Sequence, residues 1–282
     1  MPSTLRGAAL LIAAMAAFSL SDVMAKKLSA SLPPMAIAWL RYLLLLLTVL
    51  PLAIAQPAAW RTRRPLLQAG RAAGLVASAV LFLFAIQAMP VAEATAMVFA
   101  SPLFVTLLAA LVLREVVPLP RWLPVVMGFI GVLIVVRPGF LGFGGAEIFP
   151  LLSSMAWAVA VVCTRRLSEV DSATTTMLYS GVFGTAGLSL LLPALQLPDL
   201  WAQGPLVLGM AATWCAAQWL TIAAYRTAPA ASIAPFAYSQ LVWAALLGFA
   251  VFQHVPDAIS LLGMGVILAS GLAAAWQGRG RA

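Results

Sequence analysis

The chain has 282 residues, of which 63% are hydrophobic and only 9% are charged, and its mean hydropathy is +1.04. A soluble domain carries about 25% charged residues, so this composition excludes a water-soluble protein with an ordinary polar surface. The net charge of +8 does not indicate nucleic-acid binding, because the basic residues are scattered between apolar segments and form no stripe. With two cysteines inside apolar segments and a single histidine, His254, the sequence predicts no disulfide framework, no metal site and no cofactor.

Ten apolar segments of membrane-spanning length follow one another along the chain, each near the 20 or so residues that a bilayer requires. We predict helices at roughly 5–27, 34–55, 66–88, 91–113, 121–137, 146–167, 174–196, 204–225, 229–252 and 257–276. Proline-containing breaks separate them, for example at Pro33-Pro34, Pro90 and Pro229. The predicted fold class is an all-α polytopic membrane protein, with the lipid bilayer as its surroundings.

The distribution of Lys and Arg predicts the orientation of these helices, because cytoplasmic loops are enriched in basic residues. If the N-terminus is cytoplasmic, ten crossings return the C-terminus to the same side. Lys26, Lys27 and Arg137 then fall outside, and Arg41 lies within the second helix. The remaining twelve of the sixteen basic residues fall inside: Arg6, Arg61, Arg63, Arg64, Arg71, Arg114, Arg121, Arg165, Arg166, Arg226, Arg279 and Arg281.

The two halves of the chain resemble each other at an offset of 139 residues. Lys26-Lys27-Leu28-Ser29 matches Arg165-Arg166-Leu167-Ser168, Pro90 matches Pro229, and Phe99 matches Tyr238. We therefore predict a first repeat over 1–140 and a second over 141–282. Because five helices is an odd number, the second repeat must cross the membrane in the opposite sense. The prediction is thus ten transmembrane helices as two inverted five-helix repeats, an architecture that is typical of secondary transporters.

Two stretches of sequence carry a resemblance to a known family. One runs from Ala88-Met89-Pro90-Val91-Ala92-Glu93 through Ser101-Pro102-Leu103-Phe104, and the other contains Pro235-Phe236-Ala237-Tyr238. With them, essentially the whole chain resembles the EamA type of the drug/metabolite transporter superfamily. Many members have a Glu after the ninth helix where this chain has His254, and we expect His254 to be a loop residue.

The resemblance implies ten helices with both termini cytoplasmic and a central cavity between the halves. It also implies an integral protein of the bacterial inner (plasma) membrane. Its partner would be a small-molecule substrate: an amino acid, a vitamin, a nucleoside-like compound or an opine-like solute. The protein would not be an enzyme. We expect alternating access, in which the two halves rock around the cavity.

Three ionisable residues in the predicted helices are candidates for coupling or gating, because charge within a membrane is costly and tends to be functional. Asp22 and Lys26 are four residues apart on one helix face and are expected to form an ion pair. Alternatively, Asp22 exchanges a proton or Lys26 meets a substrate carboxylate. Glu93 is in the first turn of the fourth helix, where a carboxylate stabilises the helix N-terminus or serves as a gate.

The candidates for substrate binding are polar and aromatic. Arg41, beside Trp39 and Tyr42, either snorkels to the interface or grips a carboxylate with its guanidinium. Aromatic and amide side chains of the sixth, eighth and ninth helices need partners that a substrate and water could supply. The candidates among them are Trp157, Gln218, Tyr238, Gln240 and Trp243.

Two other classes of protein stay open at this point. A channel-like or structural membrane subunit would share the helices and the composition. A membrane-embedded enzyme is disfavoured because no clustered histidines and no paired-carboxylate motif occur. Small residues at close spacing, such as Gly263 and Gly265, could serve internal packing or the seam of a homodimer.

Overall fold

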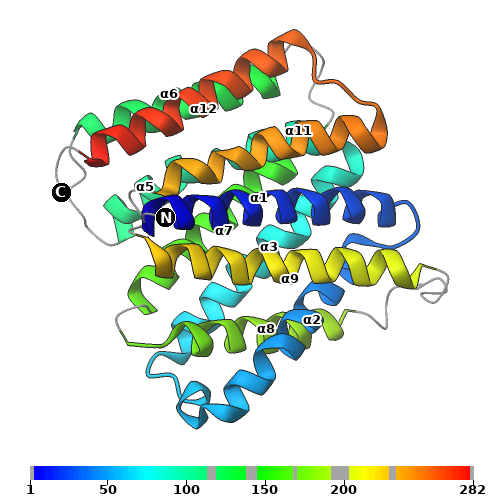
Figure 1. The fold of residues 1–282 in the computed structure, drawn as a ribbon, viewed down its shortest axis with the longest axis vertical. Coiled ribbons are helices and arrows are strands. Elements are labelled where there is room, and N and C mark those ends of the chain that lie inside the picture. The colour runs from blue at the N-terminus through cyan, green and yellow to red at the C-terminus, as the bar shows by residue number, and fades with distance from the viewer. Residues whose placement is uncertain are drawn as a thin grey trace.

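In a computed structural model of the chain, residues 3–112, 119–137, 145–167, 170–191, 203–228 and 233–279 are described. Helices make up nearly all of these residues (Figure 1). The α-helices of the first half are α1 (Ser3–Leu28), α2 (Pro34–Ala55), α3 (Pro65–Ala88), α4 (Val91–Val98), α5 (Ser101–Val112) and α6 (Leu119–Val136). Those of the second half are α7 (Ile148–Leu167), α8 (Ala173–Ser189), α9 (Gly204–Thr227), α11 (Ser239–Phe252) and α12 (Ala258–Arg279). Two short 3₁₀ helices, η1 (Pro57–Trp60) and η3 (Ala234–Tyr238), complete the described elements.

Local sequence explains where several of these helices begin. Pro34 and Pro65 are the first residues of α2 and α3, where proline's missing N–H costs nothing. Pro90, with φ −60° and ψ 147°, is the extended residue before α4. Ser172 caps α8, because its Oγ accepts a 3.1 Å hydrogen bond from the backbone N–H of Thr175.

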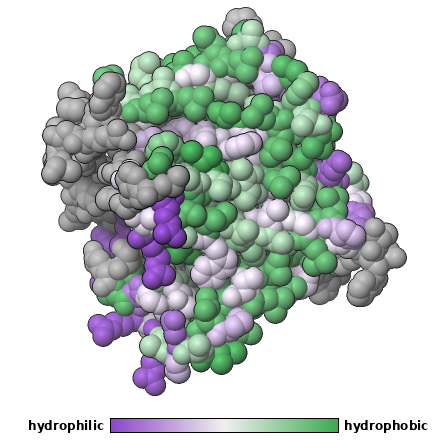
Figure 2. Space-filling view, in the orientation of Figure 1, coloured by the Kyte–Doolittle hydropathy of each residue, from purple (hydrophilic) through white to green (hydrophobic). Residues whose placement is uncertain are grey.

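Seven helical segments of the described chain are long and apolar enough to cross a membrane: Thr4–Leu28, Pro34–Ala55, Pro65–Ala88, Val91–Leu111, Ile148–Leu167, Gly204–Thr227 and Pro235–Phe252. Trp122–Val136 and Ala258–Ala274 are shorter apolar helices. The visible face of the molecule is mostly hydrophobic, and hydrophilic residues gather toward the two ends of the helices (Figure 2). This distribution is that of a bundle whose flanks face hydrocarbon and whose ends face water.

The most extensive helix pairings join the first half to the second. These pairs are α1 with α9, α3 with α7, α2 with α8 and α6 with α12. In Figure 1, α6 and α12 lie side by side at one edge of the bundle, and α2 and α8 lie together at the opposite edge. Replacing each helix by its counterpart 139 residues away turns the α1–α9 pair into the α7–α3 pair. The pattern of contacts is therefore the same when the halves are exchanged.

The fourth predicted segment, expected as one helix over 91–113, is interrupted. The chain turns at Phe99 and Ala100 between α4 and α5. Pro102 explains the break, because it has no N–H to continue the backbone ladder. The second half breaks at the corresponding place, where η3 gives way to α11 at Tyr238. The rings of Phe99 and Tyr238, equivalent residues of the two repeats, stack with their centroids 4.9 Å apart and their planes at 19°.

Glycines set the close approach of α6 and α12. A Cβ atom on Gly263 would lie 2.7 Å from the carbonyl oxygen of Gly131, and one on Gly131 would lie 2.9 Å from that of Gly263. The two backbones are therefore in direct contact, as small residues allow within membranes. In this place the small residues serve internal packing, one of the two roles that the sequence left open.

Candidate functional site

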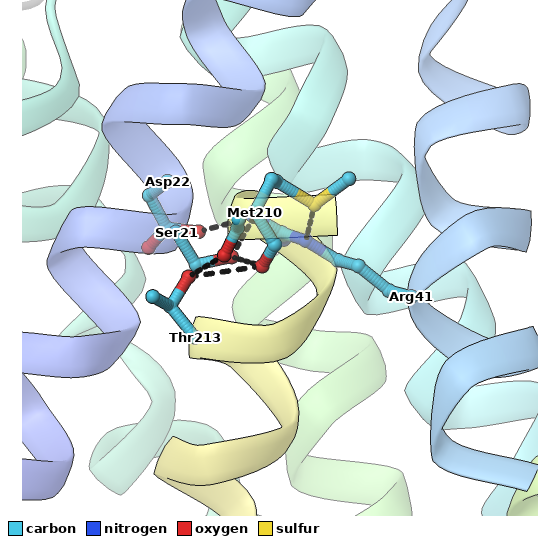
Figure 3. Close-up of polar contacts among 6 residues, drawn as sticks. Ser21, Asp22, Arg41, Met210 and Thr213 are labelled. Carbon is cyan, nitrogen blue, oxygen red and sulfur yellow. Dashed lines mark hydrogen bonds and ion pairs between the residues drawn. The ribbon is translucent and has the colours of Figure 1, made fainter. Parts of the chain in front are cut away.

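A buried ion pair lies between α1, α2 and α9 (Figure 3). Nη2 of Arg41 donates to Oδ1 of Asp22 at 3.0 Å and to Oγ of Ser21 at 3.0 Å, and Nε lies 3.3 Å from Sδ of Met210. Arg41 is 3% exposed and Asp22 is 5% exposed. Arg41 therefore does not snorkel to an interface, and its guanidinium is directed into the bundle.

The hydrogen bonds around this pair are directional. The hydroxyl of Ser21 accepts from Arg41 and donates to the backbone carbonyl of Met210 at 2.9 Å. Thr213 donates to the same carbonyl at 3.0 Å. Because α1, α2 and α9 each contribute a partner, the cluster fixes the relative positions of three helices. An ion pair supported by further hydrogen bonds is a form in which charge is tolerated at such a depth.

The expected ion pair between Asp22 and Lys26 is wrong. Asp22 pairs with Arg41, whereas Nζ of Lys26 donates to the carbonyl oxygens of Ile86 at 2.8 Å and Met89 at 2.6 Å. Ile86 is in the last turn of α3 and Met89 is its C-cap residue, and carbonyls at a helix C-terminus lack partners within the helix and attract a cation. Lys26 also lies over the ring of Phe252, 5.6 Å from its centroid.

A pocket of about 250 Å³ lies beside Lys26. It straddles the boundary between the halves, because α1, α3 and α4 supply one wall and the end of α11 supplies the other. It combines an ammonium group, an aromatic ring and an imidazole with an otherwise apolar lining. The lining residues are Lys26, Ala88, Met89, Pro90, Val91, Ala92, Gly248, Phe252 and His254.

A second cross-half contact is made next to this pocket. Nε2 of His254 lies 2.9 Å from Oε1 of Glu93. His254 is a loop residue, as expected, but it is also a partner of the candidate gate Glu93, which the sequence did not indicate. The other carboxylate oxygen of Glu93, Oε2, is buried and has no hydrogen-bond partner. The carboxylate thus bridges to the second half, and a role in gating stays a prediction.

The aromatic and amide candidates do not gather in one site; they differ in their contacts and in their exposure. Nε1 of Trp39 donates to Oγ of Ser189 at 2.8 Å. Tyr42 is buried, with its ring edge-on to that of Trp214 and close to Gly184, which leaves space for it. Trp157 is 42% exposed on α7 and lies outside the pocket lining. Gln218, Tyr238, Gln240 and Trp243 are half-buried and also lie outside it. Their part in substrate binding stays a prediction.

Arg71, expected among the cytoplasmic topology charges, is half-buried and also contacts the second half of the chain. It lies in the second turn of α3 and donates from Nε to Oγ1 of Thr164 at 2.8 Å. Its Nη1 donates to the carbonyl oxygen of Thr176 at 3.2 Å and to Oγ of Ser180. The repeat relates this contact to the first site: Arg71 is the counterpart of Met210 at the offset of 139, and the structure shows Met210 as a partner of Arg41.

At the end of the bundle where α2 gives way to α3, Asp171 joins the two halves. Its carboxylate accepts from Thr62 at 2.5 Å, from Gln68 at 2.8 Å and from the backbone N–H of Arg63 at 3.4 Å. Partial burial alone raises the pKa of Asp171, but these hydrogen bonds together outweigh it and hold the pKa below its usual range. The carboxylate is therefore ionised at neutral pH, and this tie is lost only in strong acid.

Comparison with known proteins places this arrangement among transporters. The model of the EamA-like transporter family matches the chain twice, over residues 5–137 and 145–274. The riboflavin transporter of Rhizobium johnstonii is 30% identical over 272 residues, 94% of this chain and 89% of that protein. The riboflavin transporter of Vibrio cholerae is 33% identical over 64% of this chain and 61% of that protein.

A further relative and a solved structure are also similar to this chain. The S-adenosylmethionine uptake transporter of Rickettsia prowazekii is 27% identical over 89% of this chain and 85% of that protein. A protein of known crystal structure superposes with a TM-score of 0.66 over 97% of each chain at 19% identity, a likeness of fold alone. The two matches of the family model leave out few residues between 5 and 274. The chain, an integral membrane protein with a repeated helical unit, belongs to the EamA-like transporter family.

Proposed function

We propose that this protein is a secondary carrier of flat heteroaromatic metabolites, with vitamins of the riboflavin type as the first candidates. It has ten membrane spans in two inverted five-helix repeats and cytoplasmic termini. The observation that carries the proposal is the pocket beside Lys26, since it lies where the two halves meet and both halves line it. A carrier that opens its halves alternately needs its solute to contact both of them.

The contact pattern supports the inverted repeat. The pairs α1–α9 and α7–α3 exchange when the halves are exchanged, and α2–α8 and α6–α12 are unchanged. The stacked rings of Phe99 and Tyr238 are equivalent residues in direct contact. A residue can touch its own counterpart only near the axis that relates the two halves, so these rings mark the centre of the proposed symmetry.

The chemistry of the pocket supports the choice of solute. Phe252, His254 and Pro90 offer flat or apolar contacts to a fused ring system, and Lys26 offers a donor to ring carbonyl oxygens. Relatives of this chain are named for riboflavin and for S-adenosylmethionine. The second solute carries a sulfonium cation, which the Lys26 ammonium would repel. We therefore favour the uncharged flavin over the cationic nucleoside-like solute.

Counterflow in proteoliposomes tests this function. Purified protein is reconstituted with unlabelled riboflavin inside, and uptake of labelled riboflavin is followed over a range of concentrations. A parallel series uses S-adenosylmethionine. We expect saturable exchange of riboflavin that exceeds exchange of S-adenosylmethionine. Linear, non-saturating uptake would indicate a channel, and no exchange of either solute by folded, inserted protein would contradict the proposal.

Neighbouring lysines supply a matched pair of variants for the same assay. Lys26 is half-buried at the pocket, whereas Lys27 is exposed and lies outside its lining. Lys26→Met removes the donor and is expected to raise the half-saturating concentration of riboflavin about tenfold, the effect of one charge-assisted hydrogen bond. Lys27→Met is expected to leave it unchanged. Equal effects of the two substitutions would mean that the pocket does not lie on the transport path.

A further inference from the structure

Arg41, which is buried, and Arg71, which is half-buried, occupy reciprocal places in the two halves. At the offset of 139 residues, Arg41 corresponds to Ser180 and Arg71 corresponds to Met210. Arg41 contacts Met210, and Arg71 contacts Ser180. Exchanging the halves therefore turns one contact into the other. The chain holds two versions of one site, the first between α1, α2 and α9 and the second between α7, α8 and α3.

The two versions differ in charge. Arg41 is neutralised by Asp22, whose counterpart at the offset of 139 is Val161. Among the described residues, Arg71 has no carboxylate partner, and its three hydrogen bonds go to two hydroxyls and one carbonyl. The first site is thus a neutral pair, and the second retains a full positive charge within the helical bundle.

Hydrogen bonds in the second site also fix the orientation of the Arg71 guanidinium. The hydroxyls that accept from Arg71 use their own protons elsewhere: Thr164 donates to the carbonyl oxygen of Ala160 and Ser180 to that of Thr176, both at 2.7 Å. Both hydroxyls are therefore fixed as acceptors. They and the Thr176 carbonyl occupy Nε and Nη1, and the described residues give Nη2 no partner. One edge of a fixed guanidinium stays free to bind an acceptor.

We propose that Arg71 binds a small monovalent anion, a halide or a carboxylate group, at the free Nη2 edge of its guanidinium. The physical reason is that a half-buried guanidinium with no counter-charge gains a charge-assisted hydrogen bond from an anion that accepts at its free edge. Arg41 shows how the site is completed when the chain itself supplies the carboxylate. The proposal does not rest on the identity of the transported solute.

The test measures anion binding to the purified full-length protein and is independent of transport. The thermal unfolding midpoint is recorded while chloride replaces methanesulfonate at constant ionic strength, and a second series uses acetate. We expect a saturable rise of about 2–4 °C, because a ligand that binds only the folded state stabilises it by mass action. Saturation with chloride assigns a resident halide. Saturation with acetate alone assigns a carboxylate, including one carried by a solute.

Two variants make the result specific to Arg71. Arg71→Gln removes the cation and is expected to lose the anion-dependent rise. Val161→Asp places a carboxylate at the counterpart of Asp22, one helical turn before Thr164, whose hydroxyl accepts from Arg71. It is expected to raise the midpoint in methanesulfonate and to make it independent of anions. Val161→Asp tests the anion site even if Arg71→Gln fails to fold. An unchanged anion response in Val161→Asp, or no anion response in the unmodified protein, would overturn the proposal.

Discussion

The side chain of Asp22 determines whether the α1–α2–α9 interface is electrically neutral. It supplies the only carboxylate that contacts Arg41 among the described residues, and both side chains are nearly inaccessible to solvent. A charge pair buried in this way is asymmetric in its energetics. Removing one partner leaves the other charge buried without compensation, which is strongly destabilising. Replacing both with apolar groups leaves no buried charge and costs less stability.

This asymmetry gives a prediction for Asp22 and Arg41. Asp22→Asn is expected to lower the free energy of unfolding by about 3–5 kcal/mol, because the guanidinium stays buried without a counter-charge. The double substitution Asp22→Leu with Arg41→Met is expected to be less destabilising than the single one. Thermal unfolding of the purified proteins in detergent measures both. Additive losses in the double variant would mean that the two side chains do not act as a pair.

At the scale of single helices, the contact of α6 with α12 depends on glycine at one position and not at its neighbour along the helix. A Cβ atom on Gly263 would lie 2.7 Å from the carbonyl oxygen of Gly131 and 3.1 Å from the backbone nitrogen of Val135. A Cβ atom on Gly265 would meet no atom within 4 Å. Backbone atoms cannot move aside as a flexible side chain can.

We therefore predict different results for the same substitution at these two glycines. Gly263→Ala is expected to separate α6 from α12 and to cost about 1–3 kcal/mol of stability, the usual cost of overpacking. Gly265→Ala is expected to leave stability unchanged or slightly raised, because alanine favours a helix over glycine. Unfolding midpoints of the two variants, measured side by side, provide the check. If both alanines are tolerated equally, the close approach of the backbones is not essential.

The sequence was informative about helices for a physical reason. An apolar run of spanning length has few alternative structures in a bilayer, so α2, α3 and α9 lie within about two residues of their predicted bounds. The break at Phe99 was missed because hydropathy continues unchanged through Pro102. Pro102 was the available signal, but one proline hardly changes the hydropathy of an apolar stretch.

The candidate site was harder to predict than the helices. Spacing along one helix favoured Lys26 as the partner of Asp22, but the actual partner, Arg41, comes from another helix. Sequence spacing identifies neighbours on one helix face and carries no such rule for residues of two helices. The same holds for His254 with Glu93, 161 residues apart. The repeat supplies such a rule once one contact is known, since its offset relates Arg71 to Met210, a partner of Arg41.

At the scale of the whole molecule, contacts between loops show which loops lie together at each end of the bundle. Ser31, between α1 and α2, contacts Gln203 beside α9 at one end. Asp171, between α7 and α8, contacts Thr62 and Gln68 at the other. If the proposed topology holds, the end with Ser31 faces the outside and the end with Asp171 faces the cytoplasm.

Cysteine labelling in whole cells checks this orientation. Cys163 and Cys215 are first replaced by serine, and a single cysteine is then introduced at Ser31 or at Ser172, both exposed. A membrane-impermeant maleimide is expected to label Ser31→Cys in intact cells. It is expected to label Ser172→Cys only after the membrane is opened. The reverse pattern would place both termini outside, and labelling of both positions in intact cells would contradict the topology altogether.

The pairing of helices across the halves has a consequence for synthesis. Because α1, α3 and α6 find their main partners in α9, α7 and α12, the first half leaves the ribosome before most of its contacts exist. Its helices must wait in the lipid as separate spans until the second half has been inserted. The Asp22–Arg41 pair is the exception, since both residues emerge early and can neutralise each other at once. Arg71 has to wait for Thr164 and Ser180, about a hundred residues later in translation.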